Sequence, residues 1–76
     1  MTKVNILLQS INDTKDFVNL VNRYPYNIDL CSGRYIIDAK SIMGIFSLDI
    51  SNPVEMIIYD ENPAELLQEL ERFIVK

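Results

Sequence analysis

The chain has 76 residues, nearly half of them apolar, a net charge of −4 and no histidine, so it is long enough for a single domain (residues 1–76) with one modest core. Its seven basic residues are scattered along the sequence, which argues against the clustered basic face of a nucleic-acid-binding protein. No apolar run approaches the roughly 20 residues of a membrane span.

The first third of the chain reads as a strand followed by a helix. Apolar residues alternate over 4–8, the period of a half-buried strand. Helical spacing of apolar residues then predicts a helix over about 13–23, with Asn12 or Asp13 as its N-cap. Pro25 stops this helix because proline cannot continue the hydrogen-bond ladder.

The middle of the chain predicts a hairpin and a short helix. Strands are expected over 27–32 and 35–39, joined by a tight turn in which Gly33 supplies a positive φ. Ser41 is a good N-cap for a short helix over 41–48.

The last third predicts a strand and an amphipathic helix. The strand covers 54–59, and the helix starts with Asn62 as the cap and Pro63 at the first helical position. Its apolar stripe consists of Leu66, Leu67, Leu70, Phe73 and Ile74.

The order β-α-β-β-α-β-α predicts an α+β fold. We expect an open-faced two-layer sandwich, with a four-stranded antiparallel sheet and three helices on one of its faces. Several apolar side chains on the open face make it a candidate self-association surface. The residues expected on that face are Asn5, Leu7, Asp29, Cys31, Ile36, Asp38, Ile57 and Tyr59.

The short helix after Ser41 is the most specific run in the chain. Its large apolar residues cover too much of the circumference for one amphipathic stripe, so either both faces are buried or one cluster faces solvent. We expect two or three of them to be buried and Ile42 or Met43 to be exposed. The candidate residues for docking a partner are Lys40, Ile42, Met43, Ile45 and Phe46.

Signals of catalysis are absent from the sequence. Without histidine and with Cys31 as the single cysteine, neither a metal site nor an internal disulfide is expected. No phosphate-binding glycine loop or nucleophile–base pair is present, so we predict a non-catalytic protein without a cofactor. The absence of a signal peptide and of disulfides favours the cytoplasm.

The stretch Ala39–Leu48 (AKSIMGIFSL) resembles HPr, the small phosphocarrier of the bacterial phosphoenolpyruvate:sugar phosphotransferase system. Its Lys-Ser-Ile-Met-Gly core is distinctive for HPr proteins of Gram-positive bacteria. The resemblance covers nearly the whole chain and implies the HPr fold. Further positions that fit are Phe17, Val18, Tyr24, Ile28, Asp29 and Leu30.

The resemblance implies a role in phosphate transfer, but this sequence lacks the histidine that performs it in the family. In the family, a loop histidine followed by Ala-Arg-Pro takes phosphate from enzyme I. Here Ser10 or Asn12 falls at that position, and the arginine and proline have no counterparts. Imidazole is a good reversible phosphate carrier, whereas a serine phosphate ester is far more stable. The ordinary relay is therefore excluded unless another residue has been recruited; for Ser10, the simpler interpretation is a loop or capping serine.

The resemblance also implies a regulatory role for Ser41. HPr proteins of Gram-positive bacteria carry a serine at this position that an ATP-dependent HPr kinase/phosphorylase phosphorylates, and the phosphoprotein is a co-effector of a transcription regulator. A helix N-terminus suits a phosphate, and Lys40 adds a cation beside it. Helix capping alone is the alternative role of Ser41. Asp49, where the family usually has glycine, departs from the pattern.

Three functions therefore remain open. The first is an HPr-like regulatory and docking module without histidine chemistry, switched by phosphorylation of Ser41. The second is a divergent phosphocarrier with a non-histidine acceptor such as Ser10. The third is a small oligomeric module that uses its open sheet face. The expected partners are proteins (the kinase, a transcription regulator or other phosphotransferase components), with no nucleic acid or membrane, and the chain is expected to be a monomer or weak homo-oligomer.

Overall fold

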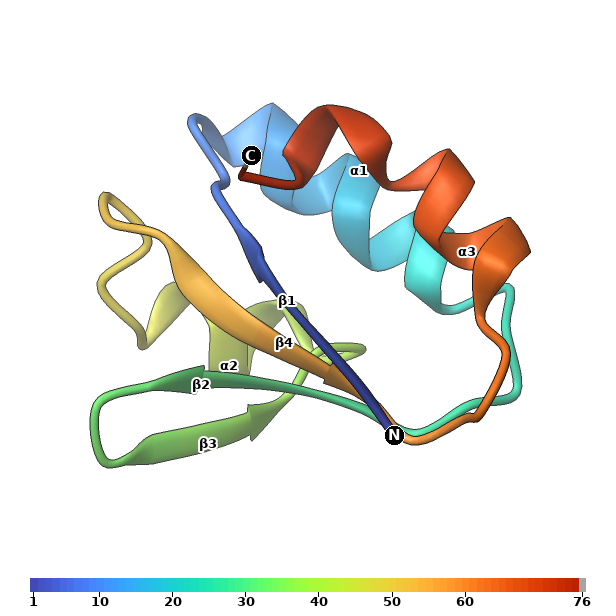
Figure 1. Ribbon diagram of the computed structural model, residues 1–76. Coiled ribbons are helices and arrows are strands. Elements are labelled where there is room, and N and C mark those ends of the chain that lie inside the picture. The colour runs from blue at the N-terminus through green and yellow to red at the C-terminus, as the bar shows by residue number, and fades with distance from the viewer. Residues whose placement is uncertain (76) are drawn as a thin grey trace.

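The computed structural model describes residues 1–75 and contains the predicted order of elements. Four strands and three helices follow one another along the chain, and a short 3₁₀ helix comes last (Figure 1). Their bounds are β1 Thr2–Ile6, α1 Ile11–Val21, β2 Ile28–Ser32, β3 Tyr35–Asp38, α2 Ile42–Phe46, β4 Val54–Ile58, α3 Ala64–Glu69 and the 3₁₀ helix Glu71–Phe73.

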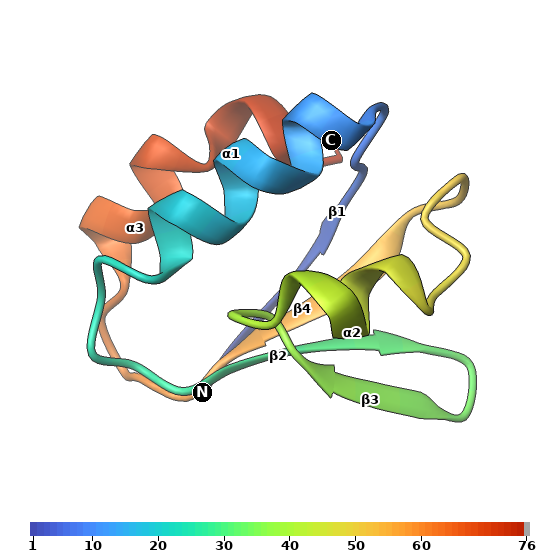
Figure 2. The ribbon, with the colours of Figure 1, turned by 180° about the vertical axis from the view of Figure 1, so that it is seen from behind.

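The strands form one antiparallel sheet in the order β1-β4-β2-β3. The helices lie on one side of this sheet, and its other face is open (Figures 1 and 2). The predicted α+β open-faced sandwich is therefore confirmed. None of the helices within residues 1–75 is long and apolar enough to span a bilayer.

The core lies between the sheet and the helices. Alternate residues of β2 and β4 point into it, because successive side chains of a strand face opposite sides. The rings of Phe17 in α1 and Phe73 near the C-terminus meet edge to face, with centroids 5.9 Å apart. Both aromatic side chains are buried, so this contact joins the two long helical segments.

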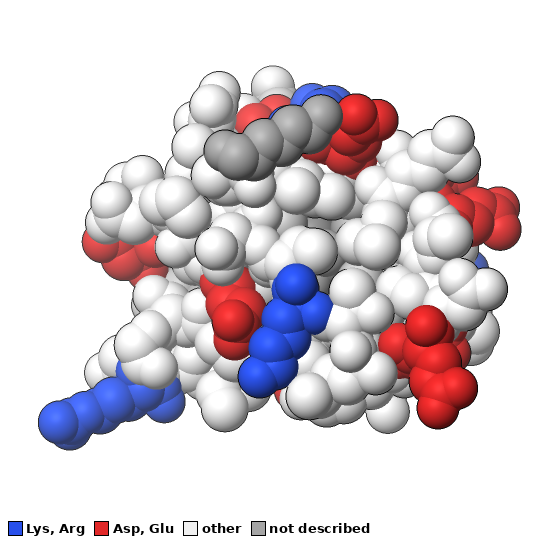
Figure 3. Space-filling view, in the orientation of Figure 1, with Lys and Arg blue, Asp and Glu red and all other residues white. Residues whose placement is uncertain are grey.

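The open face is more polar than predicted. Leu7 lies beyond the end of β1, whereas Tyr59, just after β4, still lies on this face, where its hydroxyl bonds Asp29. The prediction omitted Lys3 and Glu55, which also lie on the open face. Lys3 stands opposite Ile57, and Glu55 stands opposite both Cys31 and Asn5, and residues opposite one another in a sheet share a face. Ile57 itself is only 8% exposed. Figure 3, which views the molecule from the side away from α2, shows separated basic side chains with acidic side chains around them.

The first helix starts two residues earlier than predicted. Asn12 or Asp13 as its cap is wrong: Ser10 is the N-cap, and its hydroxyl accepts a hydrogen bond from the Asp13 N–H at 3.0 Å. At the other end the Asn22 side chain donates to the Val18 carbonyl at 2.8 Å, so the helix ends at Val21, before Pro25 is reached.

The last helix is shorter than predicted, and Asn62 does not cap it. Pro63 occupies the cap position without a side-chain hydrogen bond, while the Asn62 N–H donates to Asp60 at 3.1 Å. After Glu69 the backbone tightens into the 3₁₀ helix and then runs beside β1. There the Leu7 N–H donates to the Phe73 carbonyl at 2.8 Å, which fastens the C-terminal segment to the first strand.

Candidate functional site

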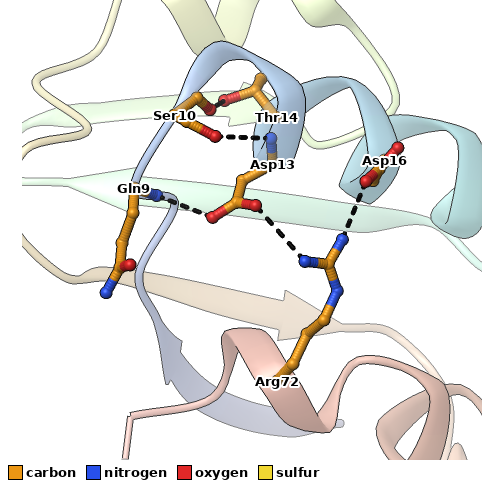
Figure 4. Close-up of polar contacts among 6 residues, drawn as sticks. All are labelled: Gln9, Ser10, Asp13, Thr14, Asp16 and Arg72. Atoms are coloured by element: carbon orange, nitrogen blue, oxygen red, sulfur yellow. Dashed lines mark hydrogen bonds and ion pairs between the residues drawn. The ribbon is translucent and has the colours of Figure 1, made fainter.

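The loop between β1 and α1 is closed by reciprocal hydrogen bonds. While the Asp13 N–H donates to the Ser10 hydroxyl, one oxygen of the Asp13 carboxylate accepts from the Gln9 N–H at 3.2 Å (Figure 4). The Ser10 carbonyl also accepts from the Thr14 hydroxyl at 3.1 Å. This arrangement is close to a capping box, which satisfies the free N–H groups of a helix start.

Arg72 completes this cluster from the far end of the chain. Its guanidinium bonds the other Asp13 oxygen at 3.3 Å and an Asp16 oxygen at 2.9 Å (Figure 4). The same guanidinium lies 4.2 Å from the centroid of the Phe73 ring. Both oxygens of Asp13 are therefore bonded. The carboxylate of Asp13 itself supplies the negative charge that the positive N-terminal end of α1 favours.

Neither candidate for the relay position is set up as a phosphate acceptor. The Ser10 hydroxyl serves as a hydrogen-bond acceptor for the backbone, and Asn12 is exposed in the first turn of α1. A serine nucleophile needs an adjacent base to remove its proton. The carboxylate of Asp13, whose own N–H bonds the Ser10 hydroxyl, is bonded through both oxygens to Gln9 and Arg72.

Ser41 lies at the N-cap of α2, as predicted. Its exposed hydroxyl accepts from the Gly44 N–H at 3.3 Å. The segment before it is tied to the end of α1: the Lys40 ammonium donates to the Tyr24 carbonyl at 2.7 Å, and the Asn22 side chain donates to the Lys40 carbonyl at 3.4 Å. Lys40 thus uses its charge to hold the start of α2 against α1.

The apolar residues of α2 divide between core and surface. Met43 is 75% exposed and Phe46 42% exposed, whereas Ile42 is partly buried against the core. Ile45 is fully buried, so its assignment as a docking residue is wrong: it lies one turn after Ile42 and faces the sheet. The expectation that Ile42 or Met43 is exposed is confirmed for Met43, whereas the expectation of two or three buried residues is wrong, since only Ile45 is fully buried. The surface that α2 offers to a partner, called here the α2 patch, consists of Met43, Phe46 and the exposed part of Ile42.

The open side of the sheet carries a hollow and a shielded thiol. The hollow, of about 400 Å³, is bordered by Asp29 and Asp38, and the Tyr59 hydroxyl donates to Asp29 at 2.9 Å. This bond is the main cause of the raised pKa of Tyr59.

The Cys31 thiol lies on the same face and is not activated. Burial, followed by the charges of Glu55 and Asp29, raises the pKa of this thiol, which lowers its reactivity. Within residues 1–75 no group of three or more potential ligands could hold a metal ion.

The Arg72 cluster is the part of the site that the sequence interpretation missed. Arg72 is separated by 59 and 56 residues from the two aspartates that it bonds. No local spacing rule connects residues so far apart, so only the packing of the C-terminal segment against α1 reveals the contact.

Comparison with known families and structures identifies the fold. The family model described as "PTS HPr component phosphorylation site" matches residues 13–76, a region that begins three residues after Ser10. No curated protein sequence gives a significant match.

Three solved structures share most of the chain. HPr-C-His from Thermoanaerobacter tengcongensis is 25% identical, with a TM-score of 0.80 over 95% of this chain and 89% of that one. The phosphocarrier protein HPr from Bacillus anthracis is 25% identical, with a TM-score of 0.75 over 97% and 94%. Crh, a catabolite repression protein of Bacillus subtilis described as an intertwined dimer with a swapped domain, is 30% identical, with a TM-score of 0.67 over 93% and 83%. The chain therefore belongs to the HPr family of the phosphotransferase system.

Proposed function

We propose that this HPr-family protein works by docking to other proteins, as a non-catalytic regulatory module, and does not pass phosphate along a relay. The observation that carries the proposal is the Asp13 carboxylate, which is bonded by the Gln9 N–H and Arg72 at the start of α1. The chain has no histidine to hold a labile phosphoryl group. In addition, a phosphate on Ser10 would stand beside this fixed negative charge and lose the cap that the hydroxyl provides.

The regulatory part of the proposal is phosphorylation of Ser41. Its hydroxyl is exposed, and its only hydrogen bond within residues 1–75 is the long one from Gly44. Removing that bond costs little, since α2 is only five residues long. The likeness to Crh, a protein named for catabolite repression, supports a regulatory role. A cytoplasmic protein kinase of the HPr kinase/phosphorylase type is the proposed modifying partner.

The α2 patch is the proposed docking surface. An exposed methionine adapts its shape to a partner, and a half-exposed phenylalanine contributes area to an interface. Both lie within five residues of Ser41, so a phosphate there would change the charge at the border of the patch. The proposed readers of this change are a transcription regulator or components of the phosphotransferase system.

Phosphorylation by a purified HPr kinase with ATP tests the regulatory part. We expect one phosphate on the native chain and none on Ser41→Ala, whereas Ser47→Ala, a matched serine at the other end of α2, is modified normally. Equal labelling of native protein and Ser41→Ala would reject the assignment.

Binding measurements test the docking part. Met43→Asp is expected to weaken binding to the kinase while the circular dichroism spectrum stays native, because Met43 is mostly exposed. Ile11→Asp, a change at an exposed apolar residue of α1, is the control. Equal affinities of native protein and Met43→Asp would contradict a role for the α2 patch.

A further inference from the structure

Strand β3 is an unprotected edge of the sheet. It pairs with β2 on one side only, and in both ribbon views no other segment lies beyond it (Figures 1 and 2). Tyr35 is 70% exposed and Ile36 65% exposed. Edge strands are usually protected by short length, charged side chains, proline, a bulge or a covering segment. Strand β3 has only its length of four residues and the charge of Asp38, and its centre is apolar. Its free backbone groups can therefore pair with another strand.

The backbone directions along β3 show which residues would form that pairing. Ala39, just after β3, faces β2, because its N–H donates at 2.9 Å to the carbonyl of Ile28, the first residue of β2. Backbone groups of successive residues in an antiparallel ladder point to alternate sides. Ile37 therefore also faces β2, whereas Ile36 and Asp38 direct their N–H groups to the free edge. The Asp38 carbonyl already accepts the Ser41 N–H at 3.0 Å, so the freest backbone groups of this edge are those of Ile36 and the Asp38 N–H.

The sequence of β3 and its turn is complementary to itself about Ile36. In an antiparallel pairing with Ile36 opposite Ile36 of a second copy, Tyr35 stands opposite Ile37 and Arg34 opposite Asp38. A pair of an aromatic and a β-branched side chain is favourable across two strands, and so is a pair of opposite charges. The two-fold axis of such a pair gives each of these contacts twice. We propose that the protein forms a dimer by joining the β3 edges of two copies into one eight-stranded sheet.

Charge on the open face supports this register. Asp29 and Asp38 are direct cross-strand partners, and like charges in that position repel. Neither Arg34 nor Asp38 takes part in an ion pair within residues 1–75. In the dimer the guanidinium of the second copy's Arg34 stands beside Asp38, next to the hollow of about 400 Å³ bordered by both aspartates and Tyr59. The dimer therefore supplies the cation that this hollow lacks in the single chain.

The β3 dimer is a small interface and differs from other ways of associating. A seam of five residues per copy buries much less than a standard interface, so the association is weak and reversible. It uses the edge of the sheet, not its open face, and exchanges no segment between copies. Both the β1–α1 loop and the α2 patch lie outside this interface, so the dimer and the proposed function can be tested separately.

Sedimentation equilibrium of the purified full chain, up to about 1 mM, tests the dimer. We expect a monomer–dimer equilibrium whose dissociation constant rises with salt, because the ion pairs are exposed. Ile36→Lys should weaken it about ten-fold or more, since two ammonium groups then meet at the two-fold axis. Ile11→Lys, a matched change at an isoleucine that is 62% exposed on α1, should leave it unchanged.

A charge exchange tests the register. Arg34→Asp alone and Asp38→Arg alone should each weaken the dimer, because each places like charges opposite one another, and the double variant should restore it. Circular dichroism confirms that each variant is folded. A chain that stays monomeric throughout this concentration range would overturn the proposal. So would a dimer that Ile36→Lys leaves intact, or one whose subunits exchange only on unfolding, as an intertwined dimer would.

Discussion

Replacing Ser10 by alanine tests whether this serine is a structural cap. The Ser10 hydroxyl accepts the Asp13 N–H at 3.0 Å, and no other side chain within residues 1–75 takes that place. Loss of such a cap costs about 1 kcal/mol, within a range of about 0.5–2. Because a domain of this size shifts by about 4–8 °C per kcal/mol, Ser10→Ala should lower the melting temperature by roughly 4–8 °C.

Thermal unfolding followed by circular dichroism at 222 nm measures this shift. Ser10→Thr keeps an oxygen at the cap and should lose only a few tenths of a kcal/mol. Ser41→Ala is a second control, and we expect a smaller shift from it because its bond to Gly44 is 3.3 Å long and α2 has only five residues. An unchanged melting temperature for Ser10→Ala would refute the capping role and leave the hydroxyl free for chemistry.

Three further changes test the fold and its titrating groups. Phe17→Ala removes a fully buried ring and should cost about 3–5 kcal/mol in urea unfolding, a large part of the stability of so small a domain. Gly44→Ala should raise stability by about 0.5–1 kcal/mol, because the new methyl group would lie 3.4 Å from the Ser41 hydroxyl, an ordinary contact, and alanine favours the helix. The hydrogen bond to Asp29 raises the pKa of Tyr59 in the folded state, so this bond stabilises the fold at neutral pH. The contribution is lost as the pH rises through the folded-state pKa. In an absorbance titration of the folded protein, Tyr59→Phe should remove a component that titrates above about pH 10.

The order of elements could be predicted because each has a clear local period. The hairpin is the best example: Gly33 has a φ of 58° in the two-residue loop that joins β2 and β3. Helix ends were predicted less well, since Ser10, Asn12 and Asp13 are all good caps. The choice among them depends on whether the third residue of the helix can reach back, and Asp13 reaches back to Gln9 only when Ser10 is the cap.

The candidate site was predictable where it is local and not where it is assembled by packing. The capping position of Ser41 followed from spacing within one short helix, and so did the exposure of either Ile42 or Met43. The burial of Ile45 depends on how α2 is turned toward the sheet, and the residues of that helix alone do not determine it. The bonds of Arg72 to Asp13 required knowing where the C-terminal segment lies.

We propose that this family member does not carry phosphate from enzyme I. Incubation of the purified chain with enzyme I and labelled phosphoenolpyruvate, beside a histidine-containing HPr as the positive control, tests it directly. We predict no label and no change in the intact mass of the chain while the control is phosphorylated. Label that reaches this chain and is lost in Ser10→Ala would contradict the account and establish a serine phosphocarrier instead.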